Sequence, residues 1–219
     1  SATKPVCGYD LKIFSEDGKE LGPNEEGLVV VKLPLPPGNM LGLWENDKRF
    51  KESYFSRFDG YYLSGDGGFI DEDGYVFITG RVDDLINVAG HRLSTAEMEE
   101  VVASHHSVAE CAVIGISDDL KGQIPVALVV VKAGESIENF QLEYEVVQLI
   151  RKRIGAVASL RNVIVVQRLP KTRSGKILRK LLRSIADGEN FQIPSTIDDE
   201  TIIEEIQNDF KISKLGKAI

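Results

Sequence analysis

The sequence has few cysteines, no long apolar run and no excess of positive charge, and each absence excludes a class of protein. Two cysteines, Cys7 and Cys111, are too few for a disulfide framework and favour a reducing compartment. No apolar run approaches the roughly 20 residues that span a bilayer, which argues against a membrane protein. The formal net charge of −8 argues against a nucleic-acid-binding protein, whose affinity usually rests on a basic face.

The first ten residues, SATKPVCGYD, lack an initiator methionine and the charged-then-apolar pattern of a targeting peptide. They are typical of mid-chain sequence, so we expect a fragment of a longer protein. With the cysteine content, this favours a cytoplasmic location or the mitochondrial matrix.

The stretch PKTRSGKILRK, Pro170–Lys180, carries five cations but lacks the spacing of a phosphate-binding Walker loop. That loop requires G-x-x-x-x-G-K-[ST], and here Pro170 and Ile177 stand at the first and last positions. A solvated loop leading into a helix remains one interpretation of the stretch. The other is a loop that delivers one lysine, because Gly175 permits a sharp turn from which Lys176 can project.

The remaining sequence predicts an α+β fold in two parts. Residues 1–82 alternate in a β-like pattern, with a hairpin turn at Asp71–Gly74. Residues 83–195 follow an αββαβα order, with a capping box at Ser94-x-x-Glu97 and a last helix that begins near Ser174. Residues 196–219 form an acidic tail, which we expect to wrap the surface or to be partly disordered.

Two further stretches carry chemistry-bearing side chains between glycines. In GYYLSGDGG, Asp66 is expected on a tight turn after a strand, where a carboxylate can accept hydrogen bonds from a ribose diol. In GRVDDLINVAGHR, Arg81 and Arg92 are candidate phosphate-binding guanidinium groups. Taken singly, the first stretch also fits a plain turn aspartate and the second a solvated hairpin.

In this order, YLSGDGG, GRVDDLINVAGHR and PKTRSGK resemble the ribose-binding, hinge and catalytic-lysine motifs of the adenylate-forming family. The resemblance covers nearly the whole chain. The longer segments VVKLPLPPG, RVDDLINVAGHRLS and LPKTRSGKILR are similar to those of the short-chain branch, the acetyl- and propionyl-CoA synthetases. Of these two, the similarity favours the propionyl-CoA synthetases. It implies the β-rich closing piece of the large N-terminal domain, followed by a small C-terminal lid domain.

The resemblance implies a role for each matching residue on the nucleotide side. Asp66 would hold the ribose hydroxyls, Arg81 would contact the ribose, and Arg92 would contact a phosphate. Asp83 would be the hinge about which the lid rotates between two half-reactions. Lys176 would be the catalytic lysine of the first half-reaction, and also a target of a lysine acetyltransferase and deacetylase.

On the thiol side, the resemblance places Gly90 beside the pantetheine tunnel and Arg151 near the CoA 3′-phosphate. It also implies a metal site at positions matching Ala103, His105 and Val108, partly through backbone carbonyls. His105 equally fits an ordinary histidine at a helix end.

These points together predict the C-terminal part of an AMP-forming short-chain acyl-CoA synthetase that uses ATP, Mg²⁺ and CoA with small-molecule substrates. The family's phosphate loop and acyl pocket are absent from this sequence. One alternative is therefore a standalone nucleotide- or CoA-binding or acetylation-regulated module without catalysis. Another is a peptide-synthetase adenylation domain, whose acceptor is a carrier-protein arm.

Overall fold

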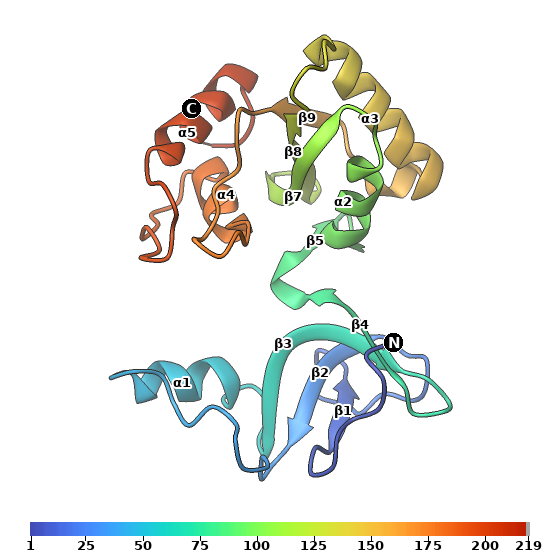
Figure 1. Ribbon diagram of the computed structural model, residues 1–219. Helices are drawn as coiled ribbons and strands as arrows, with labels where there is room; N and C mark the ends of the chain where they lie inside the picture. Colours follow the sequence, from blue (N-terminus) through green and yellow to red (C-terminus); the bar gives the residue numbers. More distant parts are fainter. Residues whose placement is uncertain (218–219) are drawn as a thin grey trace. The chain divides into compact units, whose positions relative to one another are not determined.

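The computed structural model describes residues 1–217, apart from the side chain of Arg92, and contains two compact units. The chain passes from the first unit to the second between Asp83 and Asp84. Both units mix helices with mainly antiparallel sheet, which confirms the predicted α+β class (Figure 1). None of the described helices combines the length and apolar character that crossing a membrane requires.

The first unit is a four-stranded antiparallel sheet in the order β1-β2-β3-β4 (Figure 1). Its elements are β1 (Leu11–Phe14), β2 (Gly27–Lys32), α1 (Asp47–Tyr54), β3 (Tyr61–Ile70) and β4 (Val76–Arg81). The apolar run of β2 is buried from Leu28 to Val31, and the strand has a hydrogen-bonded neighbour on both edges. Helix α1 goes beyond the prediction: it buries no residue, so it lacks the apolar stripe by which a helix is recognised in sequence.

Strand β3 differs from the expectation at Asp66. The residue lies within a ten-residue strand and not on a turn after one. The pattern was misleading because Gly65, Gly67 and Gly68 resemble turn residues. In the structure they accommodate a positive φ of 79° at Gly65 and a register shift between Gly67 and Gly68. The irregular strand carries Asp66 into direct pairing with β4.

The second unit begins with a hairpin and ends with a helix, and the predicted αββαβα order includes neither. Its elements are η1 (Val82–Asp84, at the boundary), β5 (Leu85–Val88), β6 (His91–Ser94), α2 (Thr95–Ala103), β7 (Val108–Asp118), β8 (Gly122–Val131), α3 (Asn139–Arg153), η2 (Ala156–Ala158), β9 (Asn162–Val165), α4 (Arg179–Ala186) and α5 (Ile202–Ser213). The strands form one sheet in the order β6-β5-β8-β7, and β9 pairs with β8 in parallel.

The central strands of this sheet are covered on both faces, and their side chains alternate between two cores. In β8, Val126 and Leu128 pack with α4 and α5, whereas Ala127 and Val129 pack with α2 and α3. Figure 1 shows the two pairs of helices on opposite sides of β7, β8 and β9. A strand buried on both faces has the continuous apolar sequence seen in ALVVV, residues 127–131.

The helix starts show which local signals were sufficient. Ser94 caps α2 as predicted, accepting a hydrogen bond from the Glu97 N–H at 3.3 Å. Helix α4, in contrast, begins at Arg179 and not near Ser174. Gly175 has a φ of 83°, and Lys171 forms a β-bridge with Ile177, so the chain turns back on itself before the helix starts. The apolar residues Ile177 and Leu178 therefore lie in a loop, whereas Leu181, Leu182 and Ile185 lie in α4.

The expected acidic tail contains a helix that belongs to the core. In α5, Ile202, Ile203, Ile206 and Phe210 are buried, and they pack with α4 and with the strands. Acidic side chains occupy the outer face of α5 and the segment before it, so composition alone suggested disorder. The spacing of the four apolar residues on one helical face was the contrary signal.

Candidate functional site

Arg81 is held by two aspartates in the first unit. Asp66 and Arg81 are paired across β3 and β4, and the Arg81 Nη1 lies 3.4 Å from the Asp66 Oδ1. The Arg81 Nε donates a hydrogen bond to the Asp83 Oδ1 at 3.1 Å, and Nη1 donates another to the Ser64 carbonyl at 3.1 Å. The structure therefore brings together three predicted site residues, two of them from paired strands and the third just beyond β4.

Gly65 leaves the space that the guanidinium group occupies. A Cβ atom added at Gly65 would lie 2.7 Å from the Arg81 Nη2, closer than real carbon contacts allow. Its positive φ of 79° also disfavours any residue with a side chain. The motif glycine thus has a physical function: it fixes how Arg81 crosses β3.

The Asp66 carboxylate keeps hydrogen-bond acceptors for a ligand. Only its Oδ1 contacts Arg81, and within residues 1–217 the structure gives Oδ2 no hydrogen-bond partner. The side chain is 34% exposed, so it is accessible to a ligand from solvent. A carboxylate fixed by an arginine with a remaining acceptor is suited to accept hydrogen bonds from a ligand hydroxyl.

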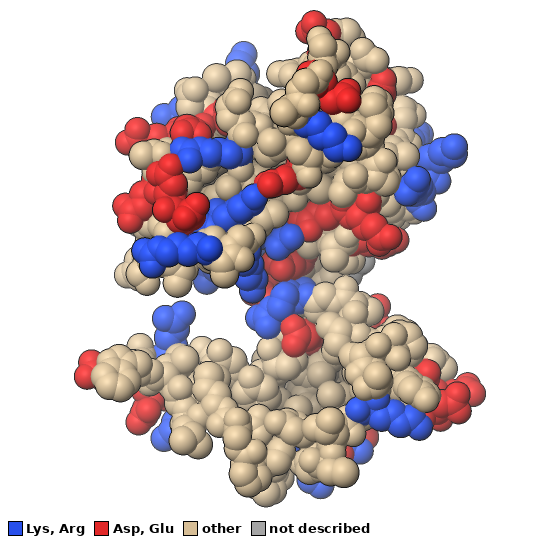
Figure 2. Space-filling view, in the orientation of Figure 1, with Lys and Arg blue, Asp and Glu red and all other residues tan. Residues whose placement is uncertain are grey.

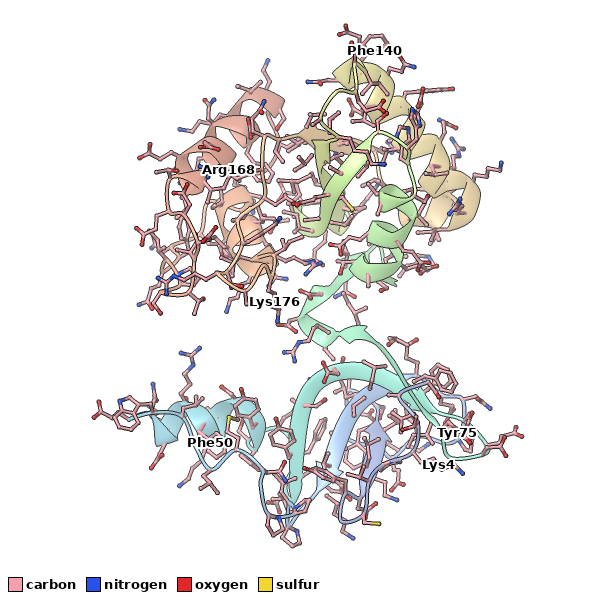
Figure 3. All side chains as sticks on the ribbon, in the orientation of Figure 1. Lys4, Phe50, Tyr75, Phe140, Arg168 and Lys176 are labelled. Atoms are coloured by element: carbon pink, nitrogen blue, oxygen red, sulfur yellow. The ribbon has the colours of Figure 1, made fainter. Side chains whose placement is uncertain are left out.

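Lys176 lies at an exposed turn of the loop before α4, and Figure 3 shows it at the edge of its unit. The backbone of this turn is fixed by Thr172. The Thr172 N–H donates to the Lys176 carbonyl at 2.8 Å, and the Thr172 Oγ1 accepts from the Lys176 N–H at 3.1 Å. In the described part of the chain no ion pair or hydrogen bond engages the Lys176 ammonium group, so its charge is available to a ligand.

Both ends of this loop are tied to the body of the second unit by ion pairs. At one end, the Lys171 Nζ lies 2.6 Å from the Glu110 Oε2 on β7. At the other, Arg179 makes a two-point contact with Glu99 on α2, with Nε–Oε1 and Nη2–Oε2 distances of 2.8 and 2.6 Å. Two-point guanidinium–carboxylate contacts fix orientation as well as distance.

The Glu99–Arg179 pair was not predicted from the sequence. Glu99 also accepts a hydrogen bond from the Val113 N–H at 2.8 Å, so one carboxylate joins α2, α4 and β7. The side chains of Glu99 and Arg179 are only 15% and 25% exposed. Arg179 was one of five cations in a stretch that resembles a solvated surface. It stands outside the apolar positions of the expected helix, so no local signal marked it as a partly buried cation that requires a partner.

Gly90 lies at the tip of the β5–β6 hairpin. Ala89 and Gly90 have φ values of 48° and 88°, as a two-residue hairpin turn with two left-handed positions requires. A Cβ atom added at Gly90 would meet no atom within 4 Å, so the surface there is open. Arg92 pairs with Asn87 in the same hairpin, and its side chain lies outside the described residues.

Arg151 lines a small cavity at the carboxyl end of α3. The cavity has a volume of about 150 Å³, and its wall also includes Arg161, Gly155 and Ser159. Two arginines and a serine are thus among the residues that line the cavity. Arginine side chains are suited to bind a phosphate or another small anion.

His105 uses both ring nitrogens for contacts within the protein. Its Nε2 lies 2.8 Å from the Glu145 Oε2 on α3, and its Nδ1 accepts from the Ser107 N–H at 3.3 Å. The residue is 8% exposed. A metal could bind the ring only if one of these contacts broke. Binding through the backbone carbonyls of Ala103, His105 and Val108 does not involve the ring, so the site expected there stays a prediction. Across residues 1–217 no three His, Cys, Asp or Glu side chains are placed to hold a metal ion.

Charge on the drawn face of the molecule is mixed. Figure 2 shows Lys and Arg side chains interspersed with Asp and Glu, and not gathered on one basic face. One ion-pair cluster illustrates this: Arg168 contacts Asp199 at 2.5 Å and Glu205 at 2.7 Å.

The sequence matches a family of enzymes over part of its length. Residues 97–176 match the model of the AMP-binding enzyme C-terminal domain. An uncharacterized protein of Pseudomonas aeruginosa is 53% identical over 216 residues, which is 99% of this chain and 34% of that protein. The human acyl-CoA synthetase short-chain family member 3, mitochondrial, is 46% identical over 210 residues, which is 96% of this chain and 31% of that protein.

The fold is similar to solved structures as well. The ATP-bound structure of MatB from Rhodopseudomonas palustris matches with a TM-score of 0.68 and 28% identity, over 84% of this chain and 35% of that chain. This chain thus spans between 31% and 34% of the length of the two curated relatives.

Proposed function

We propose that the full-length protein is an AMP-forming short-chain acyl-CoA synthetase. The chain belongs to the adenylate-forming (AMP-binding) family and corresponds to its C-terminal part. One observation carries the proposal: an exposed lysine without a partner among the described residues, on a loop whose backbone and both ends are fixed. Similarity to short-chain acyl-CoA synthetases over 96% of the chain favours an enzyme over a binding module without catalysis.

The proposed reaction has two half-reactions, adenylation of the acid and transfer of the acyl group to CoA. In the first, a carboxylate oxygen attacks the α-phosphorus of ATP, the bond from that phosphorus to the bridging oxygen breaks, and pyrophosphate leaves. In the second, the CoA thiol loses its proton, its sulfur attacks the acyl carbon of the adenylate, and AMP leaves. Mg²⁺ enters with ATP as part of the substrate.

We propose that the residues paired in the first unit bind the nucleotide. Asp66 accepts hydrogen bonds from the ribose hydroxyls through its free acceptors, and Arg81 contacts the ribose from the place that Gly65 leaves for it. Asp83, beside them, is the hinge at which the lid rotates, and Arg92 contacts a phosphate. The boundary between the two units at Asp83 and Asp84 supports a hinge in this position.

Lys176 supplies the charge that the first half-reaction requires. Negative charge shifts toward pyrophosphate as the bond to the α-phosphorus breaks. An ammonium group that is already in place stabilises this charge better than water, which must reorient. Because its loop is fixed at Thr172 and at both ends, the group needs little rearrangement of its own backbone. Acetylation would remove the charge, so we propose Lys176 as the target of a lysine acetyltransferase and deacetylase.

For CoA, we propose that Gly90 and the cavity lined by Arg151 form separate contacts. Gly90 lets the pantetheine arm approach the backbone, since it has no side chain and no atom lies within 4 Å of the place where a Cβ atom would stand. Arg151 and Arg161, which line the cavity, bind the 3′-phosphate. Residues 1–82 then close the large domain, and residues 83–195 with the C-terminal helix form the lid.

We propose a cytoplasmic or mitochondrial-matrix location; of the two, the name of the human relative, which includes the word mitochondrial, favours the mitochondrion. The two cysteines are not paired with each other. Burial raises the pKa of the Cys111 thiol to about 11, so this thiol stays protonated near neutral pH.

The experiment that tests the proposal uses the full-length protein with ATP, Mg²⁺, CoA and a series of short carboxylic acids. We expect AMP, pyrophosphate and a thioester in equal amounts, with propionate or acetate as the best acid. Carrier protein offered in place of CoA tests the peptide-synthetase alternative. Formation of ADP, or of an adenylate that only carrier protein accepts, would exclude the proposed activity.

A further inference from the structure

The C-terminal segment beyond the lysine loop contacts that loop through its backbone. We call residues 194–213 the C-terminal brace; they lie beyond residue 176, where the match to the AMP-binding enzyme C-terminal domain ends. The Arg173 N–H donates to the Thr196 carbonyl at 2.9 Å, and the Asp198 N–H donates to the Lys171 carbonyl at 2.9 Å. Thr172 and Ile197 pair between these bonds as a β-bridge. The brace thus adds a short strand along the first half of the loop.

The brace is anchored in two ways. Its helix, α5, packs Ile202, Ile203, Ile206 and Phe210 into the core that α4 also enters. At the surface, Arg168 binds Asp199, Thr201 and Glu205, and Figure 3 shows Arg168 between the end of β9 and α5. Arg168 stands three residues before Lys171, so the same point holds the entry to the lysine loop and the start of the brace.

A continuous set of contacts leads from this anchor to Lys176. The brace holds the backbone of Lys171 and Arg173, and Thr172, between them, holds the backbone of Lys176 on both its N–H and its carbonyl. None of these contacts uses the Lys176 ammonium group. The loop is therefore fixed while its charge stays available.

We infer that the C-terminal brace is a positioning element for Lys176 in adenylation, an inference that rests on the proposed function. Electrostatic stabilisation of a reacting phosphate depends on placement, and a displacement of about 1 Å at a reacting group can cost on the order of 10²-fold in rate. Without the brace, one side of Lys171–Arg173 loses its hydrogen bonds, and the loop gains other conformations. Such a loss affects the half-reaction that uses Lys176, whereas a merely stabilising helix would affect both half-reactions alike.

The test compares Ile197→Ala with Ile212→Ala in the full-length protein. Ile197 is 4% exposed against the loop, and Ile212 is 71% exposed on the same brace, so the two changes are chemically identical and differ in place. Adenylation is measured by pyrophosphate release from acid and ATP, and thioester formation from supplied acyl-adenylate and CoA. We expect Ile197→Ala to slow adenylation about tenfold and thioester formation by less than about twofold, with no change in Ile212→Ala.

A second measurement separates positioning from general stability. In a Lys176→Ala background, Ile197→Ala should slow adenylation no further, because the group that the brace positions is gone. An equal loss in both half-reactions, no loss at all, or the same loss in the Lys176→Ala background would overturn the inference. If Ile197→Ala does not fold, Arg168→Gln at the exposed anchor is measured in the same way and judged by the same outcomes. A wild-type protein that makes no adenylate would instead refute the proposed function.

Discussion

Two regions of the molecule carry a candidate nucleotide-binding cation, and they differ in whether its charged group has partners within the protein. In the first unit, Arg81 is engaged by Asp66, Asp83 and the Ser64 carbonyl. In the second, Lys176 has its backbone fixed by Thr172, whereas no described residue pairs with its ammonium group. A residue that only binds can keep its partners throughout a reaction cycle. A lysine whose ammonium group must act in one half-reaction and leave in the other has to be positioned through contacts to its backbone alone.

The largest expected effect concerns the residue at which the two regions separate. Proline fixes φ near −65° and also restricts the residue before it, so Asp83→Pro should limit the torsion change at the hinge. We expect one half-reaction to slow relative to the other by more than about a hundredfold, or ~2.7 kcal/mol. Asp83→Ala removes the same carboxylate but leaves the backbone free, and should change both rates alike. Equal slowing in Asp83→Pro would count against a hinge here.

The next effect concerns the fixed arginine. Gly65→Ala and Gly60→Ala both place a side chain at a similar φ, 79° and 77°, which costs an L-residue roughly 1–2 kcal/mol. Only at Gly65 does the new Cβ atom meet Arg81; at Gly60 nothing lies within 4 Å. We expect both variants to lose similar stability, and Gly65→Ala alone to bind ATP about tenfold more weakly, since charged hydrogen bonds are lost. Denaturant unfolding and calorimetric titration of the full-length protein measure the two effects.

A smaller effect concerns the free lysine's backbone. Thr172→Val removes the hydroxyl that accepts from the Lys176 N–H, and Thr172→Ser keeps it. One hydrogen bond contributes about 1 kcal/mol, so Thr172→Val should slow adenylation about fivefold. Thioester formation from supplied adenylate should stay unchanged. If the serine and valine variants behaved alike, the methyl group and not the hydroxyl would be what matters.

The smallest effect is a pH dependence at the anchor of the C-terminal brace. The hydrogen bond from Arg168 lowers the pKa of Asp199 to about 2. A lowered pKa means that the pair's stability is present above the unfolded value of about 3.9 and is lost as the pH falls toward 2. The difference in urea midpoint between the wild type and Asp199→Asn should therefore shrink from about pH 4 downward.

Local sequence signals predicted the class of the fold and many of its elements, where side-chain chemistry alone decides the structure. Ser94 caps α2 as expected, because a cap depends on residues within one turn. The extent of β3 and the start of α4 were not predictable in this way. In both, glycines at Gly65 and Gly175 take positive φ values that only tertiary pairing selects. Composition hid α5, since its acidic outer face and its buried face were averaged together.

In the candidate site, too, some residues could be predicted from the sequence and others could not. Asp66, Arg81 and Lys176 stand in motifs that a single sequence can display, and the structure leaves them exposed or half-exposed. Glu99 and the C-terminal brace support the loop from elements distant in sequence. Their roles depend on contacts such as Glu99 to Arg179, across 80 residues, which no local pattern can encode.

The half-reaction rates of Lys176→Ala in the full-length protein probe the free ammonium group most directly, with Lys180→Ala, an exposed cation of the same stretch, as the control. Adenylation should fall by on the order of 10²–10³, while thioester formation from supplied adenylate and both rates of Lys180→Ala stay near wild type. Equal loss of the two half-reactions in Lys176→Ala, or undiminished adenylation, would show that this lysine does not serve the first step.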